Sequence, residues 1–300
     1  MNVERAKLPT EQSNPATAEL DRLTTEEAVA LIQSEDAKLH AALAAAQREI
    51  AAAVELVAAR LAAGGRLLYV GAGTSGRLAN HDAVECPPTF QTPPELVRAL
   101  IAGGPAALTR AVEGAEDDER AAVRDLDAAG LSAKDVVFGV AASGTTPYVR
   151  AALARAKHVG AATVFLACVP RELVPDDADV SIRVVTGPEV LTGSTRLKAG
   201  TATKLVLNTV STLVMVRLGR VHGNRMVAVD TRGNAKLVDR GVRLVAELAG
   251  LDREGAAKAL GAADGDVRVA ILMARLKLDR ETARARLSAS GSLRRALGER

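Results

Sequence analysis

The chain has 300 residues, of which 48% are hydrophobic and 25% are charged, so it can bury a large core and has the composition of a globular protein. Its formal net charge of +3 is too small to predict nucleic-acid binding, and its two distant cysteines indicate neither a disulfide framework nor a metal cluster. The first residues lack the apolar core of a signal peptide, and the most apolar segment, Leu205–Val216, is shorter than the roughly 20 residues of a membrane span. We therefore expect a cytoplasmic protein that binds no membrane.

Residues 1–65 are expected to form an N-terminal arm followed by helices. Two prolines, at positions 9 and 15, favour an extended arm over residues 1–20. Thr24 or Thr25 can cap a helix that runs to about Ser34. From Leu39 to Leu61, apolar residues recur every three or four positions, which predicts one long helix that ends at the glycine pair 64–65.

Residues 66–233 show the alternating pattern of an α/β domain. Short apolar runs of strand length are separated by helical stretches, and continuous apolar strands of this kind form parallel sheets covered by helices on both faces. A long, mostly apolar helix is expected over residues 198–219. The predicted strands are Leu67–Val70, Val97–Ile101, Val136–Val140, Thr163–Ala167 and Ile182–Val185.

Residues 234–300 contain no strand pattern and are expected to form a small, all-helical C-terminal subdomain. Asp252 and Asp279 are typical N-caps of short helices. The segment holds 14 Lys and Arg residues against 9 Asp and Glu residues, a net charge of +5. Because neither an aromatic platform nor a dense basic run accompanies these charges, we interpret them as a solvated helix surface and expect no nucleic-acid partner.

A glycine-rich turn follows the first predicted strand and precedes a helix. Its sequence, Gly71-Ala-Gly-Thr-Ser-Gly76, matches the dinucleotide fingerprint G-x-G-x-x-G, but that fingerprint also needs an acidic residue after the second strand. The second strand here ends in Gly103-Gly104-Pro105, and the residue after Gly76 is an arginine where a P-loop needs a lysine. We therefore expect no nucleotide-derived cofactor.

A second hydroxyl-rich turn, at residues 141–147, follows the predicted strand 136–140 in the same way. Pro147 suits the first position of a helix, with Thr146 as its cap. Capping alone would explain either turn taken singly, but in a parallel sheet both turns lie along one edge, where glycines, hydroxyls and helix N-termini bind phosphates. Together they predict a sugar-phosphate site whose binding residues include Gly73, Thr74, Ser75, Ser143, Thr145 and Thr146.

Two carboxylates are candidates for acid–base catalysis. Glu85 precedes the proline pair 87–88, which is expected to end the helix and hold this side chain rigidly. Glu116 lies in the acidic run 113–119, which in most proteins would be a solvated helix start. Two glutamates in separate loops can supply a base and an acid without a metal. A third polar cluster, at residues 187–201, adds Glu189, Ser194 and Lys198 as candidate substrate-binding residues, although a capped helix start with exposed cations would explain the cluster equally well.

These motifs together resemble the N-acetylmuramic acid 6-phosphate etherases, a branch of the sugar isomerase (SIS) domain proteins. The resemblance covers nearly the whole chain, and the strings Glu85-Cys-Pro-Pro-Thr89 and Glu113-Gly-Ala-Glu-Asp117 are uncommon and occur in the expected order. The other matching strings are Thr10–Pro15, Gly71–Leu78, Ile101–Gly104, Ala141–Gly144, Thr146–Val149, Gly187–Val190, Thr192–Ser194, Lys198–Thr201 and Gly223–Asn224.

The resemblance implies a carbon–oxygen lyase of amino-sugar catabolism and peptidoglycan recycling. Such an enzyme would release D-lactate from N-acetylmuramic acid 6-phosphate by elimination and hydration, leaving N-acetylglucosamine 6-phosphate. Glu85 aligns with the family's proton donor and Glu116 with its second catalytic glutamate; which of them acts at which step stays open. Family members are homodimers and use no metal.

Several positions depart from the family pattern. Val84 stands where a serine is usual, Thr145 where an arginine is common, His222 where an aromatic residue is common and Ala228 where an aspartate is common. These changes keep two alternatives open: a non-catalytic sugar-phosphate sensor, like the related glucokinase regulatory protein, and an aldose–ketose isomerase on the same fold. A transcription regulator is disfavoured, because such SIS proteins carry an N-terminal helix-turn-helix that residues 1–65 do not resemble.

Overall fold

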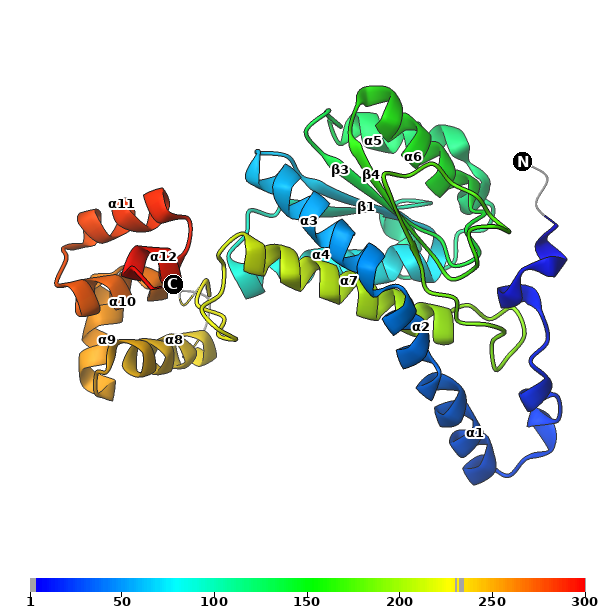
Figure 1. The fold of residues 1–300 in the computed structure, drawn as a ribbon, viewed down its shortest axis with the longest axis horizontal. Coiled ribbons are helices and arrows are strands. Elements are labelled where there is room, and N and C mark those ends of the chain that lie inside the picture. Colours follow the sequence, from blue (N-terminus) through cyan, green and yellow to red (C-terminus); the bar gives the residue numbers. More distant parts are fainter. Residues whose placement is uncertain (1–3, 230, 232–234, 300) are drawn as a thin grey trace. The chain divides into compact units, whose positions relative to one another are not determined.

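The structure is a computed structural model that describes residues 4–229, 231 and 235–299 (Figure 1). These residues form two compact units. The first comprises the chain up to Ala83 together with Glu95–Ser211, and the second comprises Val84–Pro94 together with the chain from Thr212 onward. The division into 1–65, 66–233 and 234–300 stays a prediction, and its second boundary lies outside the described residues.

The first unit is built on a parallel five-stranded sheet, as the sequence predicts, and its strand order is β2-β1-β3-β4-β5. β5 was expected at 182–185 but pairs with β4 two residues earlier, because register with the neighbouring strand sets its limits: Val180 lies opposite Val164 and Arg183 opposite Ala167. The strands are β1 Leu67–Gly71, β2 Val97–Ile101, β3 Val136–Val140, β4 Ala162–Ala167 and β5 Val180–Arg183.

Helices cover both faces of this sheet. Alternate side chains of a strand point to opposite faces, so Leu68 and Val70 join a buried cluster with α5 (Glu119–Ala128) and α6 (Pro147–Val159). Tyr69, between them, points to the other face, where its hydroxyl donates to Asp82 of α4 at 3.0 Å. Figure 1 shows α5 and α6 on one face and α3 and α7 on the other.

The N-terminal segment differs from the extended arm expected from its prolines. It forms four short 3-10 turns, and Pro9 and Pro15 each occupy the first position of one, where a missing N–H costs nothing. Leu8 is buried in the core of the sheet domain, with 1% of its surface exposed. The turns are Arg5–Lys7, Pro9–Glu11, Pro15–Thr17 and Leu20–Arg22.

The helices before β1 follow the sequence pattern with one break. Thr24 and Glu27 form the reciprocal capping box of α1, so the predicted start is confirmed. The single long helix expected from the apolar stripe is divided at Ala46, whose backbone (φ −94°, ψ 8°) leaves the helical geometry. The helices are α1 Thr25–Ala37, α2 Leu39–Ala45 and α3 Gln47–Ala62.

Helix α4 (Gly73–Phe90) continues through the two prolines that were expected to end it. Only its last turn lies beyond them, closed by a hydrogen bond from the Gln91 N–H to the Pro87 carbonyl. Gln91 itself has a φ of 53°, a left-handed conformation that stops the helix. The prolines therefore lie one turn before the end of α4.

The second unit is all-helical, as expected for the C-terminal part of the chain, and has its own core around Val245, Leu260, Ile271 and Leu293. The side chains of Asp252 and Asp279 cap α9 and α11, which confirms both predicted N-caps. Its helices are α8 Ala235–Ala249, α9 Arg253–Ala262, α10 Val267–Leu276, α11 Arg280–Ser290 and α12 Leu293–Leu297.

Helix α7 (Lys198–Arg217) is the one described helix whose length and hydropathy would allow it to cross a membrane. Of the most apolar 18-residue stretch of this helix, 56% is buried inside the protein, as is usual for the core helix of a globular domain.

Candidate active site

The two hydroxyl-rich turns meet because of the strand order. The chain runs from β1 outward to β2 and then returns to place β3 on the other side of β1. In open α/β sheets, the crevice for a ligand forms at such a reversal, beyond the carboxyl ends of the strands. The turns that follow β1 and β3 both leave the sheet at this point.

The first turn is compact because its glycines are in close contact. A Cβ atom on Gly71 would lie 2.7 Å from the backbone nitrogen of Gly76, and a Cβ on Gly76 would lie 2.6 Å from Cγ1 of Ile101 on β2. Gly73 has a φ of 51°, which side chains rarely allow. These contacts press the start of α4 against β1, so that Thr74 and Ser75 lie in its first turn.

The second turn holds its hydroxyls without using all of them as helix caps. The Ser143 and Thr145 hydroxyl oxygens are 2.9 Å apart, and the Thr145 N–H donates to Ser143 Oγ at 3.4 Å. Pro147 begins α6, as predicted, but the side chain of Thr146 forms no capping hydrogen bond. Capping therefore does not account for Thr146, whose hydroxyl is available to a ligand.

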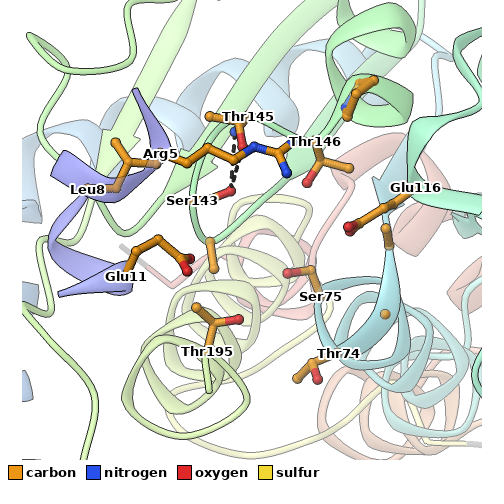
Figure 2. Close-up of a pocket in the computed structure, with 14 residues that line it drawn as sticks. Arg5, Leu8, Glu11, Thr74, Ser75, Glu116, Ser143, Thr145, Thr146 and Thr195 are labelled. Atoms are coloured by element: carbon orange, nitrogen blue, oxygen red, sulfur yellow. Dashed lines mark hydrogen bonds between the residues drawn. The ribbon is translucent and has the colours of Figure 1, made fainter. Parts of the chain in front are cut away.

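A cavity of about 280 Å³ lies between the two turns (Figure 2). In the close-up, Ser75 and Glu116 point into it from different segments. Seven residues singled out from the sequence line it, namely Gly73, Thr74, Ser75, Glu116, Ser143, Thr145 and Thr146. A second hollow of about 260 Å³ shares Ala72, Gly73 and Glu116 with it and is bounded by the loop around residues 111–117.

The N-terminal arm supplies lining residues that sequence reasoning missed. Arg5, Leu8 and Glu11 line the cavity, and among the described lining residues Arg5 is the one cation. The arm is fixed in place by the buried Leu8 and by Thr17, whose hydroxyl donates to the Val190 carbonyl at 2.9 Å. Local sequence patterns do not predict where an arm docks. The only sequence signal in this segment was the family string Thr10–Pro15.

Glu85 does not line this cavity. It is exposed, nearer the C-terminal end of α4 than Thr74 and Ser75, and it belongs to the second compact unit. Its neighbour Val84 is 56% exposed. The structure of the first unit therefore brings Glu116, but not Glu85, to the hydroxyl-rich turns.

Glu189 and Lys198 are buried away from the cavity, with other partners. The Glu189 carboxylate accepts the backbone N–H groups of Lys198 and Ala199, both at 2.9 Å, and so caps α7. The Lys198 ammonium lies 2.8 Å from Oε2 of Glu35. Both side chains thus position the start of α7, and of this polar cluster Thr195, rather than the predicted Ser194, lines the cavity.

Glu35 is held ionised by this environment. Its burial acts to raise its pKa, but hydrogen bonds from Lys198, Lys38 and Asn14 outweigh that effect and lower the pKa to about 2. The carboxylate therefore remains charged at neutral pH.

Among the residues that the structure describes, no group of three or more His, Cys, Asp or Glu side chains is placed to hold a metal ion. Cys168 is fully buried, and burial together with the charge of Glu189 raises the pKa of its thiol to about 12. Its thiol is therefore no nucleophile at neutral pH. The carboxylates and hydroxyls are the groups that can act on a ligand.

Known proteins resemble this chain over nearly its full length. It is 54% identical over 284 residues to the N-acetylmuramic acid 6-phosphate etherase of Synechococcus sp. (strain CC9605), covering 95% of this chain and 90% of that protein. The etherase of Gloeobacter violaceus is 54% identical (97% and 94% covered) and that of Mycolicibacterium smegmatis is 53% identical (97% and 98% covered).

Two further likenesses concern the sheet domain. The family model for the glucokinase regulatory protein N-terminal SIS domain matches residues 49–157. A phosphoheptose isomerase from Francisella tularensis superposes with a TM-score of 0.51 at 18% identity, covering 65% of this chain and 100% of that one. At this identity the likeness shows the SIS-type fold alone.

Proposed function

Since the chain belongs to the N-acetylmuramic acid 6-phosphate etherase family, we propose that it cleaves the D-lactyl ether of N-acetylmuramic acid 6-phosphate. The products are N-acetylglucosamine 6-phosphate and D-lactate. The observation that carries this proposal is the identity of more than half of the residues along nearly the whole chain. The hydroxyl-lined cavity at the strand reversal supports it, since its hydroxyl groups can bind the oxygens of a sugar phosphate.

The phosphate is expected to bind between the two turns. The hydroxyls of Ser143, Thr145 and Thr146 can donate to its oxygens, and the first turn of α4 offers free N–H groups and the positive end of the helix dipole. Arg5 lies over the same cavity (Figure 2). Thr145 stands where an arginine is common in the family. In this chain, Arg5 supplies a positive charge to the cavity from a different part of the sequence.

The reaction is a carbon–oxygen elimination followed by hydration. In the open-chain sugar, the aldehyde makes the C2 proton acidic; a glutamate removes that proton, a C2=C3 double bond forms, and the C3–O bond breaks as lactate leaves with a proton. Water then adds at C3, and a proton returns to C2. Glu116 is one of the two catalytic glutamates because it faces the cavity, and Glu85 is the other on the strength of its family alignment.

The wider setting follows from the substrate class. We place the enzyme in the cytoplasm, in peptidoglycan and amino-sugar recycling, and as a homodimer. The first two assignments follow from a substrate that is a phosphorylated wall sugar, and the third follows from the family resemblance.

A sugar-phosphate sensor is the second candidate. It is favoured by the match of residues 49–157 to the glucokinase regulatory protein SIS domain. Incubating the purified chain with N-acetylmuramic acid 6-phosphate and assaying D-lactate separates the two. Tight binding without lactate release would establish the sensor; lactate release, with solvent deuterium at C2 of the product in heavy water, establishes the etherase.

Substitution of the glutamates tests their roles. Glu116→Gln and Glu85→Gln should each reduce lactate release by about 10²- to 10⁴-fold. Glu119→Gln is the matched control, because Glu119 is exposed in the same acidic run and lines neither hollow. Full activity in either glutamate variant would remove that residue from the mechanism.

A further inference from the structure

The helical unit contains a hollow of its own. Its volume is about 440 Å³, within the range of small-molecule sites, and its wall is formed by residues from the segment just after α7, from the start of α10 and from helix α11. The three cations on this wall are Arg220, Arg268 and Arg284. None of the residues that line the cavity of the sheet domain takes part.

Of the three arginines, Arg220 has the weakest hydrogen bonding and ion pairing. Within the described ranges it pairs with no carboxylate, and its guanidinium contacts the backbone oxygen of Gln91 at a long 3.4 Å. Burial and the charge of Arg268 lower its pKa, although it stays protonated at neutral pH. A partly buried guanidinium with one weak hydrogen bond leaves several N–H donors without a strong acceptor.

Arg268 and Arg284 are only weakly neutralised. Asp266 faces Arg268 at 3.4 Å, but its other oxygen accepts the N–H groups of Arg268 and Val269 and caps α10, so one carboxylate serves two purposes. Arg268 also contacts Oε1 of Gln91 at 3.2 Å. Arg284 reaches the exposed Asp264 at 3.4 Å. The guanidinium groups thus retain capacity for an anion.

We infer that this hollow is a second anion site, which binds a small phosphate ester between Arg220, Arg268 and Arg284. Guanidinium groups present paired N–H donors that match phosphate oxygens, and the exposed Ser288 adds a hydroxyl to the same wall. Part of the positive charge of the C-terminal segment is therefore gathered in one hollow and not spread over a solvated surface. The size of the hollow suits a metabolite and not a polymer.

The site adjoins the end of α4. Both Arg220 and Arg268 contact Gln91, the first residue after that helix, whose side-chain amide also donates to the Val229 carbonyl at 3.3 Å. A bound phosphate would compete for the same guanidinium donors. The helix that carries Glu85 therefore ends next to a residue that contacts two of the three arginines.

Titration calorimetry of the full chain with inorganic phosphate tests the inference. Since the cavity of the sheet domain can also take phosphate, the titration is made in a Ser143→Ala/Thr146→Val background. We expect one phosphate to bind per chain in this background, and the added substitutions Arg220→Gln and Arg268→Gln to weaken its binding at least tenfold. Arg280→Gln is the matched control, because it removes an exposed arginine of the same helical unit that lies outside the hollow.

The outcome does not depend on etherase activity. Absence of phosphate binding in the Ser143→Ala/Thr146→Val background, or equal weakening by Arg280→Gln, would overturn the site. Should the double arginine variant fail to fold by circular dichroism, Arg284→Gln alone decides, since its side chain is 48% exposed and tolerates substitution. An unchanged affinity in that variant would count against the inference.

Discussion

The ammonium of Lys198 lies 2.8 Å from the carboxylate of Glu35, and both side chains are almost completely buried. This ion pair joins α1 to the start of α7 across 163 positions of sequence. Asn14, in the arm, donates to the same Glu35 oxygen at 2.9 Å. One buried carboxylate thus connects the arm, α1 and the long core helix.

Breaking this pair should destabilise the protein strongly. Glu35→Gln would leave the buried Lys198 ammonium without its carboxylate, a change that typically costs about 3–5 kcal/mol. Lys198→Met should cost less, because Lys38 and Asn14 remain as partners of Glu35. Urea unfolding measures the loss. The double variant Glu35→Met/Lys198→Met removes both charges and should regain much of that stability. If the double variant instead lost as much unfolding free energy as the two single variants together, the two charges would not stabilise each other.

The same carboxylate predicts a loss of stability in acid. Its pKa of about 2 in the folded chain lies below the ordinary value of 4.5, so the folded state favours the ionised form. The stabilisation is fully present above pH 4.5 and is lost as the pH falls toward 2. The difference in unfolding free energy between wild type and Glu35→Gln, measured from pH 6 to pH 3, should therefore shrink below pH 4.5. A constant difference would contradict the assignment.

Arg5 should contribute to substrate binding and not to the chemical steps. Arg5→Gln removes the cation over the cavity, so we expect KM for the sugar phosphate to rise about tenfold while kcat changes little. Lys7→Gln is the control, because Lys7 is exposed, pairs with Glu4 at 2.7 Å and does not line the cavity. Equal KM values for Arg5→Gln and wild type would remove the arm from the site.

Two glycines should respond in opposite ways to alanine. In Gly76→Ala, the new methyl group would meet Ile101 Cγ1 at 2.6 Å and the Gly71 carbonyl at 2.9 Å, which should cost about 1–3 kcal/mol and displace the phosphate turn. A Cβ atom on Gly261, in α9, would meet no other atom within 4 Å, so Gly261→Ala should stabilise by roughly 0.5–1 kcal/mol. Thermal unfolding of both variants checks this contrast.

The local features of the chain could be predicted because short-range physics sets them. The strands β2, β3 and β4 end where the sequence indicated, the capping residues Thr24, Asp252 and Asp279 cap their helices, and Pro147 begins α6. Each of these features depends on neighbouring residues alone. Two predictions that rested on prolines were wrong. The N-terminal segment is not extended, because proline also starts 3-10 turns, and α4 does not end at Pro87 and Pro88, because the end of the helix accommodates both prolines.

By itself, the sequence determined the parallel sheet, the two hydroxyl-rich turns and the family to which the chain belongs, because hydrophobic runs, glycines and caps are read over a few residues. Only the tertiary structure decided which polar groups reach the cavity. It brought Arg5 and Glu11 there from the arm, and it committed Glu189 to capping α7 and Lys198 to Glu35. A buried charge must find a partner, and that partner can lie anywhere along the chain.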